Sequence, residues 1–476
     1  MKISWKISKL FLLIIFSTAF YSSAQTDNIF KNGRLEVSPN GRYLQFTNGK
    51  PFFWLADTGW LLFSKLNREE AIKYLDNRKD KGFNVIQAIV IHSFPEVNVY
   101  GDSAFINDDP AKPKVTPGNN PGDSIQYDFW DHVDYIVNQA AERGIFIAMV
   151  PVWGSNVRDK KINIKNAKIF ANWIAERYKN KPNIIWINGG DTKGGDNLDV
   201  WNLIGNTIHM VDPNHLITFH PFGRTESSTW FQAESWLSFN MFQSGHRSYK
   251  QDSTGYGEDN WKYVQDDYNK LPIKPTLDGE PSYEGIPYGL HDTTQPRWNN
   301  NDVRRYAYWS VFAGACGFTY GNNAVWQMHK PTDKNGAYGV KEFWYNAVND
   351  SGACEMVYLK NLMLSRPYLE RVPDQALVAG NNGKKYNYIA ATKGRDYLFA
   401  YTYNGRKFEI KLGKIRGKKV KAYWYNPRNG STDFIGEFKN QGTKIFIPPG
   451  EERDGNDWVL VVDDASKRFL NPGVLK

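Results

Sequence analysis

The spacing of hydrophobic and polar positions changes repeatedly between residues 52 and 322. "REEAIKYLDNRKDKG" (68–82) has Ala71, Ile72 and Leu75 at helical spacing and ends at a glycine. The next run, "FNVIQAIV", is apolar on both faces of a strand, and "YDFWDHVDYIVNQAAERG" followed by "IFIAMVPVW" repeats the sequence of helix and strand. Strands that are apolar on both faces and are separated by helices predict a parallel sheet covered by helices.

Eight segments read as such strands: 52–57, 84–91, 145–153, 183–191, 216–223, 237–243, 275–280 and 317–322. Eight parallel strands with helices between them favour a (β/α)8 barrel. A doubly wound sheet is the alternative, but it usually carries a glycine-rich phosphate turn. No G-x-G-x-x-G follows any of these strands.

The alternation of helix and strand patterns stops in the sequence before and after the eight strands. We assign residues 25–370 to the catalytic barrel, including an N-terminal β-hairpin in "GRLEVSPNGRYLQFTNG". From 371 to 476, short alternating runs such as "YLFAYTYNGRKFEIKL" lie between turn residues and predict an antiparallel β-sandwich. This second domain shows no catalytic constellation, so we expect it to stabilise the barrel, with a binding module as the alternative.

Residues 1–24 have the features of an export signal. Lys2, Lys6 and Lys9 precede the apolar run "LFLLIIFSTAF", which is too short to span a bilayer, and Ser22-Ser23-Ala24 forms a cleavage site before Gln25. A cysteine for lipid attachment is absent there, and no other stretch reaches the length of a membrane span. We expect an exported protein, periplasmic or secreted.

Charge and composition narrow the possible partners. Loss of the three signal lysines lowers the net charge from +9 to +6, spread along the chain without the basic cluster of a nucleic-acid-binding fold. This mild excess suits an anionic polymer. Aromatic residues make up 15%, which fits either sugar stacking or an aromatic-rich core. Cys316 and Cys354 form neither a disulfide scaffold nor a zinc motif, and their pairing stays open.

The carboxyl ends of barrel strands line the active site in this fold. Applied to the eight strands, this rule selects carboxylates, imidazoles, amides and indoles, the groups that bind hydroxyl-rich ligands. The candidates for substrate contact are Asp57, His92, Trp153, Asn188, His220, Gln243, His246, Asp278 and Trp326. Asp57 could instead cap a turn, and Asp278 could support the site through hydrogen bonds.

Two further carboxylates, Asp191 and Glu280, end strands four and seven. Like charges this close are costly unless they have a function. Glycoside hydrolysis requires such a pair, with one carboxylic acid protonating the leaving oxygen and one carboxylate attacking the anomeric carbon. Retaining barrel glycosidases place it on these strands, commonly with Asn-Glu on strand four. Here strand four ends in Asn188-Gly189-Gly190-Asp191. The acid is an aspartate, which is shorter than the usual glutamate, and two glycines separate it from the asparagine. We expect no metal and no cofactor.

Three motifs, "GRLEVSPNGRYLQFTNGKPFFWLADTGW", "NIIWINGGD" and "LDGEPSYEG", resemble the apiosidase-like glycosidases of glycoside hydrolase family 140. The resemblance covers residues 30–365 and extends to the C-terminal β-domain, which in such proteins is labelled collagen-binding. It implies a (β/α)8 catalytic domain and cleavage of apiose from pectic rhamnogalacturonan side chains. It also implies Asp191 as acid/base and Glu280 as nucleophile.

Other functions fit less well. H-E-x-x-H and G-x-S-x-G are absent, which argues against a zinc metalloprotease and a serine hydrolase. A non-catalytic carbohydrate- or collagen-binding protein is the main alternative, but it leaves the two carboxylates without a role. A polysaccharide lyase is a weaker one.

Overall fold

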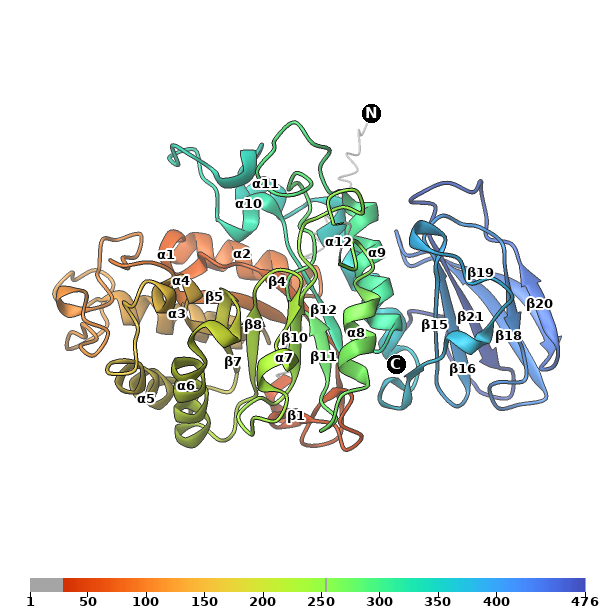
Figure 1. Cartoon of the computed structure of the whole chain (residues 1–476), viewed down its shortest axis with the longest axis horizontal. Helices are drawn as coiled ribbons and strands as arrows, with labels where there is room; N and C mark the ends of the chain where they lie inside the picture. The colour runs from red at the N-terminus through yellow and green to blue at the C-terminus, as the bar shows by residue number, and fades with distance from the viewer. Residues whose placement is uncertain (1–28, 253–254, 476) are drawn as a thin grey trace, which may run out of the picture.

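The structure of the protein is a computed structural model that describes residues 29–252 and 255–475 (Figure 1). Its first part is a closed ring of parallel strands. Its members are β4 (Trp54–Thr58), β5 (Val85–Ile91), β6 (Phe146–Val152), β7 (Ile184–Thr192), β8 (Ile217–Pro221), β10 (Asn240–Gln243), β11 (Thr276–Asp278) and β12 (Gly317–Tyr320). The ladder runs β8-β7-β6-β5-β4-β12-β11-β10, and the short β9 (Thr225–Glu226) adds antiparallel to β10. Hydrogen bonds from the backbone N–H of Ser238 to the carbonyl of Ile217 (2.8 Å) and from Thr218 Oγ1 to the carbonyl of Phe239 (2.7 Å) link β8 to β10. The predicted (β/α)8 barrel is confirmed.

Helices connect the strands and cover the outside of the barrel. The longer ones are α2 (Arg68–Asp80), α3 (Phe129–Glu142), α5 (Ala167–Tyr178), α6 (Leu198–Val211), α8 (Trp261–Tyr268), α9 (Asn300–Phe312) and α12 (Ser351–Leu364). Before and between them lie the short helices α1 (Leu62–Lys65), α4 (Gly154–Arg158), α7 (Ser228–Phe231), α10 (Asn323–Trp326) and α11 (Trp344–Ala347). Capping boxes start α2, α3 and α9, where Asn67, Asp128 and Asn299 accept hydrogen bonds from the first turn. Gly82 and Gly144 follow α2 and α3 with φ of 78° and 70°, the left-handed conformation that ends a helix.

A small antiparallel sheet closes the end of the barrel opposite to the carboxyl ends of the strands. It consists of β1 (Leu35–Val37), β2 (Leu44–Phe46) and β3 (Pro51–Phe52). Phe52 contacts Phe146, the first residue of β6, with ring centroids 5.4 Å apart. The first predicted strand, 52–57, therefore joins two elements: Phe52 pairs with Leu44 in this sheet, and the barrel strand begins at Trp54.

The second part of the structure is a sandwich of two antiparallel sheets. The larger sheet has the order β13 (Val372–Pro373), β15 (Ile389–Lys393), β16 (Tyr397–Thr402), β21 (Trp458–Asp464), β18 (Lys419–Tyr425) and β19 (Thr432–Lys439). The smaller sheet has the order β14 (Val378–Ala379), β17 (Phe408–Lys411) and β20 (Thr443–Phe446). Leu398, Leu460, Ile410 and Phe446 are buried in the core between them. The predicted antiparallel sandwich is confirmed.

The sandwich packs on the side of the barrel through α9 (Figure 1). Tyr308 of α9 stacks on Tyr401 of β16 with ring centroids 4.8 Å apart. Arg304, also on α9, forms a buried bidentate ion pair with Asp457 at 2.9 Å for both bonds, and Arg366 pairs in the same way with Asp463. Removing one partner of a buried pair costs about 3–5 kcal/mol because the other charge stays desolvated. The sandwich therefore covers one side of the barrel through a buried interface.

A chain that ends at Ser365 is expected to be poorly soluble. It exposes Tyr308 and Phe312 to water and deprives Arg304 of Asp457, so an apolar face with a weakened charge pair replaces a buried interface. The measurement is the soluble fraction and the size-exclusion profile after expression without residues 366–476. A monodisperse product that melts at the same temperature as the full chain would contradict this expectation.

Cys316 is buried and Cys354 is exposed, and the two are not bonded to each other. Among the described residues, no helix has both the length and the apolar character that crossing a membrane requires. The predicted signal segment, residues 1–24, lies outside the described residues.

Candidate active site

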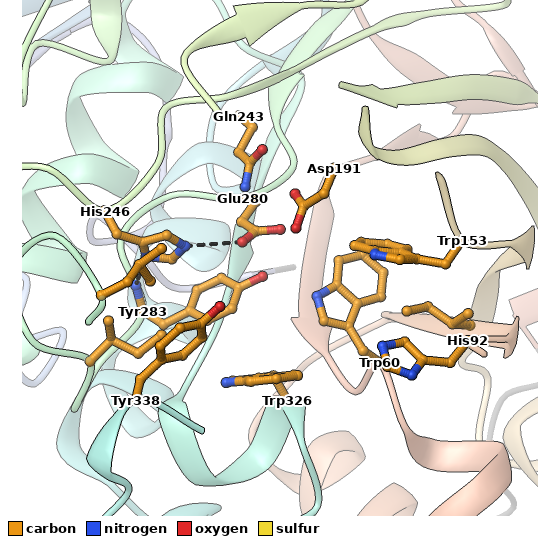
Figure 2. A pocket seen from close by; sticks show the side chains of 13 residues that line it. Trp60, His92, Trp153, Asp191, Gln243, His246, Glu280, Tyr283, Trp326 and Tyr338 are labelled. Carbon is orange, nitrogen blue, oxygen red and sulfur yellow. Dashed lines mark hydrogen bonds and ion pairs between the residues drawn. The ribbon is translucent and has the colours of Figure 1, made fainter. Parts of the chain in front are cut away.

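A cavity of about 200 Å³ opens at the carboxyl ends of the barrel strands (Figure 2). Five aromatic side chains are among the residues that line it: Trp60, Trp153, Tyr283, Trp326 and Tyr338. Asp191 and Glu280 face each other in the cavity, and one oxygen of each carboxylate lies within 4.8 Å of the other. The two carboxylates that the strand-end rule selected therefore meet in an aromatic-lined pocket.

A glycine turn at the end of β7 directs Asp191 into this cavity. Gly189, Gly190 and Asp191 have φ of 90°, 108° and 44°, and the pairing of β7 with β8 shifts register between Gly189 and Thr192. A Cβ atom at Gly190 would come within 2.3 Å of the Trp153 ring, so only glycine allows the turn to pass this close. Bulges of this kind re-aim side chains beside active sites.

Two histidines hold the carboxylate of Glu280. His246 Nε2 lies 3.0 Å from Glu280 Oε1, and His220 Nε2 lies 3.1 Å from Oε2. The backbone N–H groups of Tyr283 and Asp191 donate to the Nδ1 atoms of His246 and His220, at 3.4 and 3.5 Å. Because each Nδ1 is an acceptor, each ring carries a proton at Nε2, and His246 donates that proton to Glu280 Oε1.

The environment separates the pKa values of the two acids. Burial raises the pKa of Asp191 to about 6, and the nearby charge of Glu280 adds to the rise. Burial would also raise the pKa of Glu280, but the contacts with His220 and His246 outweigh it and hold that pKa well below its usual range. One group is thus poised to donate a proton while the other stays ionised, the division of roles that paired-carboxylate catalysis needs.

Most of the residues predicted from strand ends line the cavity. His92, Trp153, Gln243, His246 and Trp326 do so together with the two carboxylates. His220 is fully buried beneath the cavity, where it contacts three of the residues that line it: Glu280, Trp60 and Trp153.

Together with His220, three further predicted substrate-binding residues lie outside the cavity, which corrects the expectation that these four line it. Asp57 accepts from Tyr74 (2.6 Å) and Arg78 (3.1 Å) on α2. Asn188 donates to the carbonyl of Trp201 on α6 (2.9 Å). Asp278 accepts from Ser244 (2.7 Å) and Asn260 (3.0 Å), the supporting role considered from the sequence. Asp57 and Asn188 thus bind to helices behind their strands, and Asp278 binds the two ends of the loop between β10 and α8.

Several lining residues were not predicted. Trp60 follows Asp57 by three positions, and Tyr283 follows Glu280 by the same interval, so both belong to turns that the strand-end rule had marked. Tyr338 comes from a long loop after β12 and carries no comparable signal. The apolar members are Ile89, Ile286 and Leu290.

A second cavity of about 250 Å³ adjoins the first and shares Asp191, Gln243, His246 and Leu290 with it. Its own lining includes Arg224, Arg247 and His291. Arg224 forms a long ion pair with Asp252, in which its Nε lies 4.0 Å from Oδ2 of the carboxylate. The second cavity therefore brings two arginine side chains to its walls together with Asp191.

One set of donor atoms in the described part of the chain is compact enough to share a metal ion. It consists of one oxygen of Asp191, one oxygen of Glu280 and a ring nitrogen of His220, which lie within 4.8 Å of one another. These are the groups that form the carboxylate pair and its support.

Comparisons with known proteins agree with this site. The family described as "Apiosidase-like, catalytic domain" matches residues 38–370, and the family described as "Putative collagen-binding domain of a collagenase" matches residues 372–463. A comparison with curated proteins gives no match.

Two solved structures are similar over nearly the whole chain. One, described as "Glycoside hydrolase", is 48% identical with a TM-score of 0.88 and covers 93% of this chain and 99% of its own. The other, a glycoside hydrolase family 5 protein from Bacteroides vulgatus ATCC 8482, is 46% identical with a TM-score of 0.89, over 93% and 95% of the two chains. These matches confirm the prediction of a glycoside hydrolase and disfavour a non-catalytic binding protein.

Proposed function

Because the chain belongs to the apiosidase-like family and is a glycoside hydrolase, we propose that it removes apiose from pectic rhamnogalacturonan side chains by a retaining two-carboxylate mechanism. The observation that carries the mechanism is the approach of Asp191 and Glu280 to within 4.8 Å at their nearest oxygens. Retaining pairs stand about 5–5.5 Å apart, whereas inverting pairs need roughly 6.5–9.5 Å to admit a water.

In the first step, a carboxylate oxygen of Glu280 attacks the anomeric carbon as the bond from that carbon to the leaving oxygen breaks. Asp191 gives its proton to the leaving oxygen, and a glycosyl ester of Glu280 remains. In the second step, Asp191 takes a proton from water, the water oxygen attacks the anomeric carbon, and the ester bond breaks to restore Glu280. His220 and His246 keep the Glu280 carboxylate ionised and fix its orientation.

The two cavities give this reaction its two binding positions. Trp60, Trp153 and Trp326 offer flat apolar faces to the sugar whose anomeric carbon lies at Glu280. The leaving group would occupy the second cavity, which Asp191 also lines and where Arg224 and Arg247 favour an anion. A uronate of a pectic chain has this character, which supports a pectic substrate.

Product analysis on a panel of polysaccharides tests the proposal, with pectic rhamnogalacturonan first and neutral mannans and xylans beside it. Release of apiose from the pectic sample supports the proposed substrate. Release of another sugar would overturn the apiose assignment, and products that absorb in the ultraviolet would indicate a lyase. Proton NMR of the first product formed reports its anomeric configuration, and inversion would contradict the mechanism.

Replacing Arg247 by alanine is expected to raise KM for a uronate-bearing oligosaccharide about tenfold, the loss of one charge-assisted hydrogen bond. The same variant should hydrolyse a 4-nitrophenyl glycoside, which lacks a carboxylate, at the rate of the wild type. Lys250→Ala is the matched control, because Lys250 is an exposed cation of the same loop outside the cavity. Equal KM changes in both variants would argue against a specific anion site.

The rate is expected to fall as the pH rises through about 6. The mechanism needs Asp191 protonated, and burial raises the pKa of Asp191 to about 6, so the active form is lost on the alkaline side. Glu280 must be ionised, and because its pKa is held low the acid limb lies well below pH 4.5. The measurement is kcat/KM against pH, with the melting temperature recorded at each pH. A flat profile between pH 5 and 8 would contradict Asp191 as the acid.

We also propose export of the mature chain after cleavage at Ala24–Gln25. The basic, apolar and small-residue regions of residues 1–24 support it. N-terminal sequencing of the protein recovered from periplasm and medium tests it, and a product that begins at Met1 would overturn it.

A further inference from the structure

The loop that carries His246 connects β10 to α8 and is described at residues 244–252 and 255–260. Its two ends are fixed on one buried carboxylate of the barrel. Asp278 accepts from Ser244 Oγ at 2.7 Å and from Asn260 Nδ2 at 3.0 Å. Those bonds hold the two ends of the loop. The part between the ends, which includes Tyr249 and Glu258, is held by other contacts.

Glu258 provides the attachment in that middle part. It is buried, and its Oε1 accepts from the backbone N–H of Tyr249 at 3.0 Å, three residues after His246. Its Oε2 accepts from Arg305 of α9 at 2.6 Å. The hydroxyl of Tyr386 lies 3.1 and 3.0 Å from the two oxygens. Tyr386 belongs to the C-terminal domain, in the 3₁₀ turn Lys385–Asn387 before β15.

Side-chain packing continues this attachment. The ring centroids of Tyr386 and Tyr249 lie 5.5 Å apart. The guanidinium of Arg305 lies 4.7 Å from the centroid of the Tyr386 ring. The ammonium of Lys385 lies 4.9 Å from the centroid of the Tyr249 ring. Two consecutive residues of the C-terminal domain therefore contact the segment that follows His246.

We infer that Tyr386 is a positioning residue for the hydrolysis. Through Glu258 and Tyr249 it holds the loop that presents His246 Nε2 to Glu280, so the C-terminal domain acts on the active site as well as on stability. The inference rests on the proposed role of Glu280. It also explains why the buried Glu258 carries bonds from three separate elements instead of a single ion pair.

The test variant is Tyr386→Phe in the full chain, which removes the hydroxyl and keeps the ring. Tyr388→Phe is the control, because Tyr388 stacks on Trp261 in the same interface at 4.2 Å and, among the described residues, makes no hydrogen bond to Glu258. Histidine-labelled protein, with eight histidines in the chain, reports the ring nitrogen shifts of His246 by NMR without any substrate. The His246→Gln variant assigns that signal.

We expect Tyr386→Phe to shift the His246 Nε2 resonance and Tyr388→Phe to leave it in place. With 4-nitrophenyl apiofuranoside as probe, Tyr386→Phe should lower kcat about five- to tenfold with KM unchanged, since small misplacements of catalytic groups are costly. In a His246→Gln background the same replacement should have no further effect on kcat.

An unshifted His246 resonance in Tyr386→Phe would overturn the inference, and so would a loss of kcat that adds fully to that of His246→Gln. A wild type that does not hydrolyse the apioside would overturn the proposed substrate. It would leave the NMR result as the test of this inference.

Discussion

Replacement of Glu280 by glutamine is expected to abolish hydrolysis of every substrate, with kcat lower by roughly 10⁴-fold or more. Glutamine keeps the shape of the side chain but has no carboxylate to form the glycosyl ester, and leaving-group quality cannot compensate for a missing nucleophile. The measurement is kcat on a natural oligosaccharide and on a 4-nitrophenyl glycoside. Mass spectrometry of wild-type enzyme trapped with a slow substrate should place the sugar on Glu280.

The chain offers a close control in Glu284, four residues further on. Burial raises the pKa of Glu284 to about 7, and it accepts from the Tyr320 hydroxyl at 2.6 Å outside the cavity. Because Glu284 is largely protonated in the working range, glutamine reproduces its shape and its neutral charge. We expect Glu284→Gln to keep near-wild-type activity. Near-normal turnover by Glu280→Gln would refute the nucleophile assignment.

Replacement of Asp191 by asparagine is expected to lower activity according to the leaving group. On a natural sugar leaving group, kcat should fall about 10²–10⁴-fold, the contribution of general acid catalysis. On a 4-nitrophenyl glycoside, whose leaving group needs little protonation, the first step should survive and the glycosyl enzyme should accumulate. Pre-steady-state release of nitrophenol, seen as a burst, measures this directly.

Azide distinguishes the role of Asp191 from simple damage to the site. In the asparagine variant a small anion can attack the glycosyl enzyme without a general base, so added azide should restore turnover. The expected product is a glycosyl azide with the configuration of the substrate. An inverted azide would contradict the double displacement. No rescue together with an equal loss on both substrates would remove Asp191 from the acid/base role.

The sequence by itself determined the barrel and selected the two carboxylates that meet in its cavity. Apolar runs such as Val85–Ile91 are buried on both faces, as in a parallel sheet covered by helices, and glycines such as Gly82 end the helices between them. The strand-end rule then led to Asp191 and Glu280, because the carboxyl ends of all barrel strands meet on one face. These features depend on local period and chain order, which sequence records directly.

Only the tertiary structure decided which strand-end side chains enter the cavity. Asp278 and Glu280 are two positions apart and would share a face in a continuing strand, but β11 ends at Asp278. The chain then turns, so Asp278 binds Ser244 and Asn260 while Glu280 reaches His220 and His246. The direction of a side chain beyond a strand end depends on the turn and on the neighbouring loops, and no local pattern encodes either.

The walls and supports of the site also come from segments far apart in the chain. Tyr338 closes the cavity from a loop after β12, and Tyr386 reaches the loop of His246 from the other domain. Neither residue lies at a strand end of the barrel, so hydrophobic periodicity and strand-end position carry no information about them. They meet the site because the ring of strands closes and the sandwich docks on α9, and such long-range packing exists only in the folded chain.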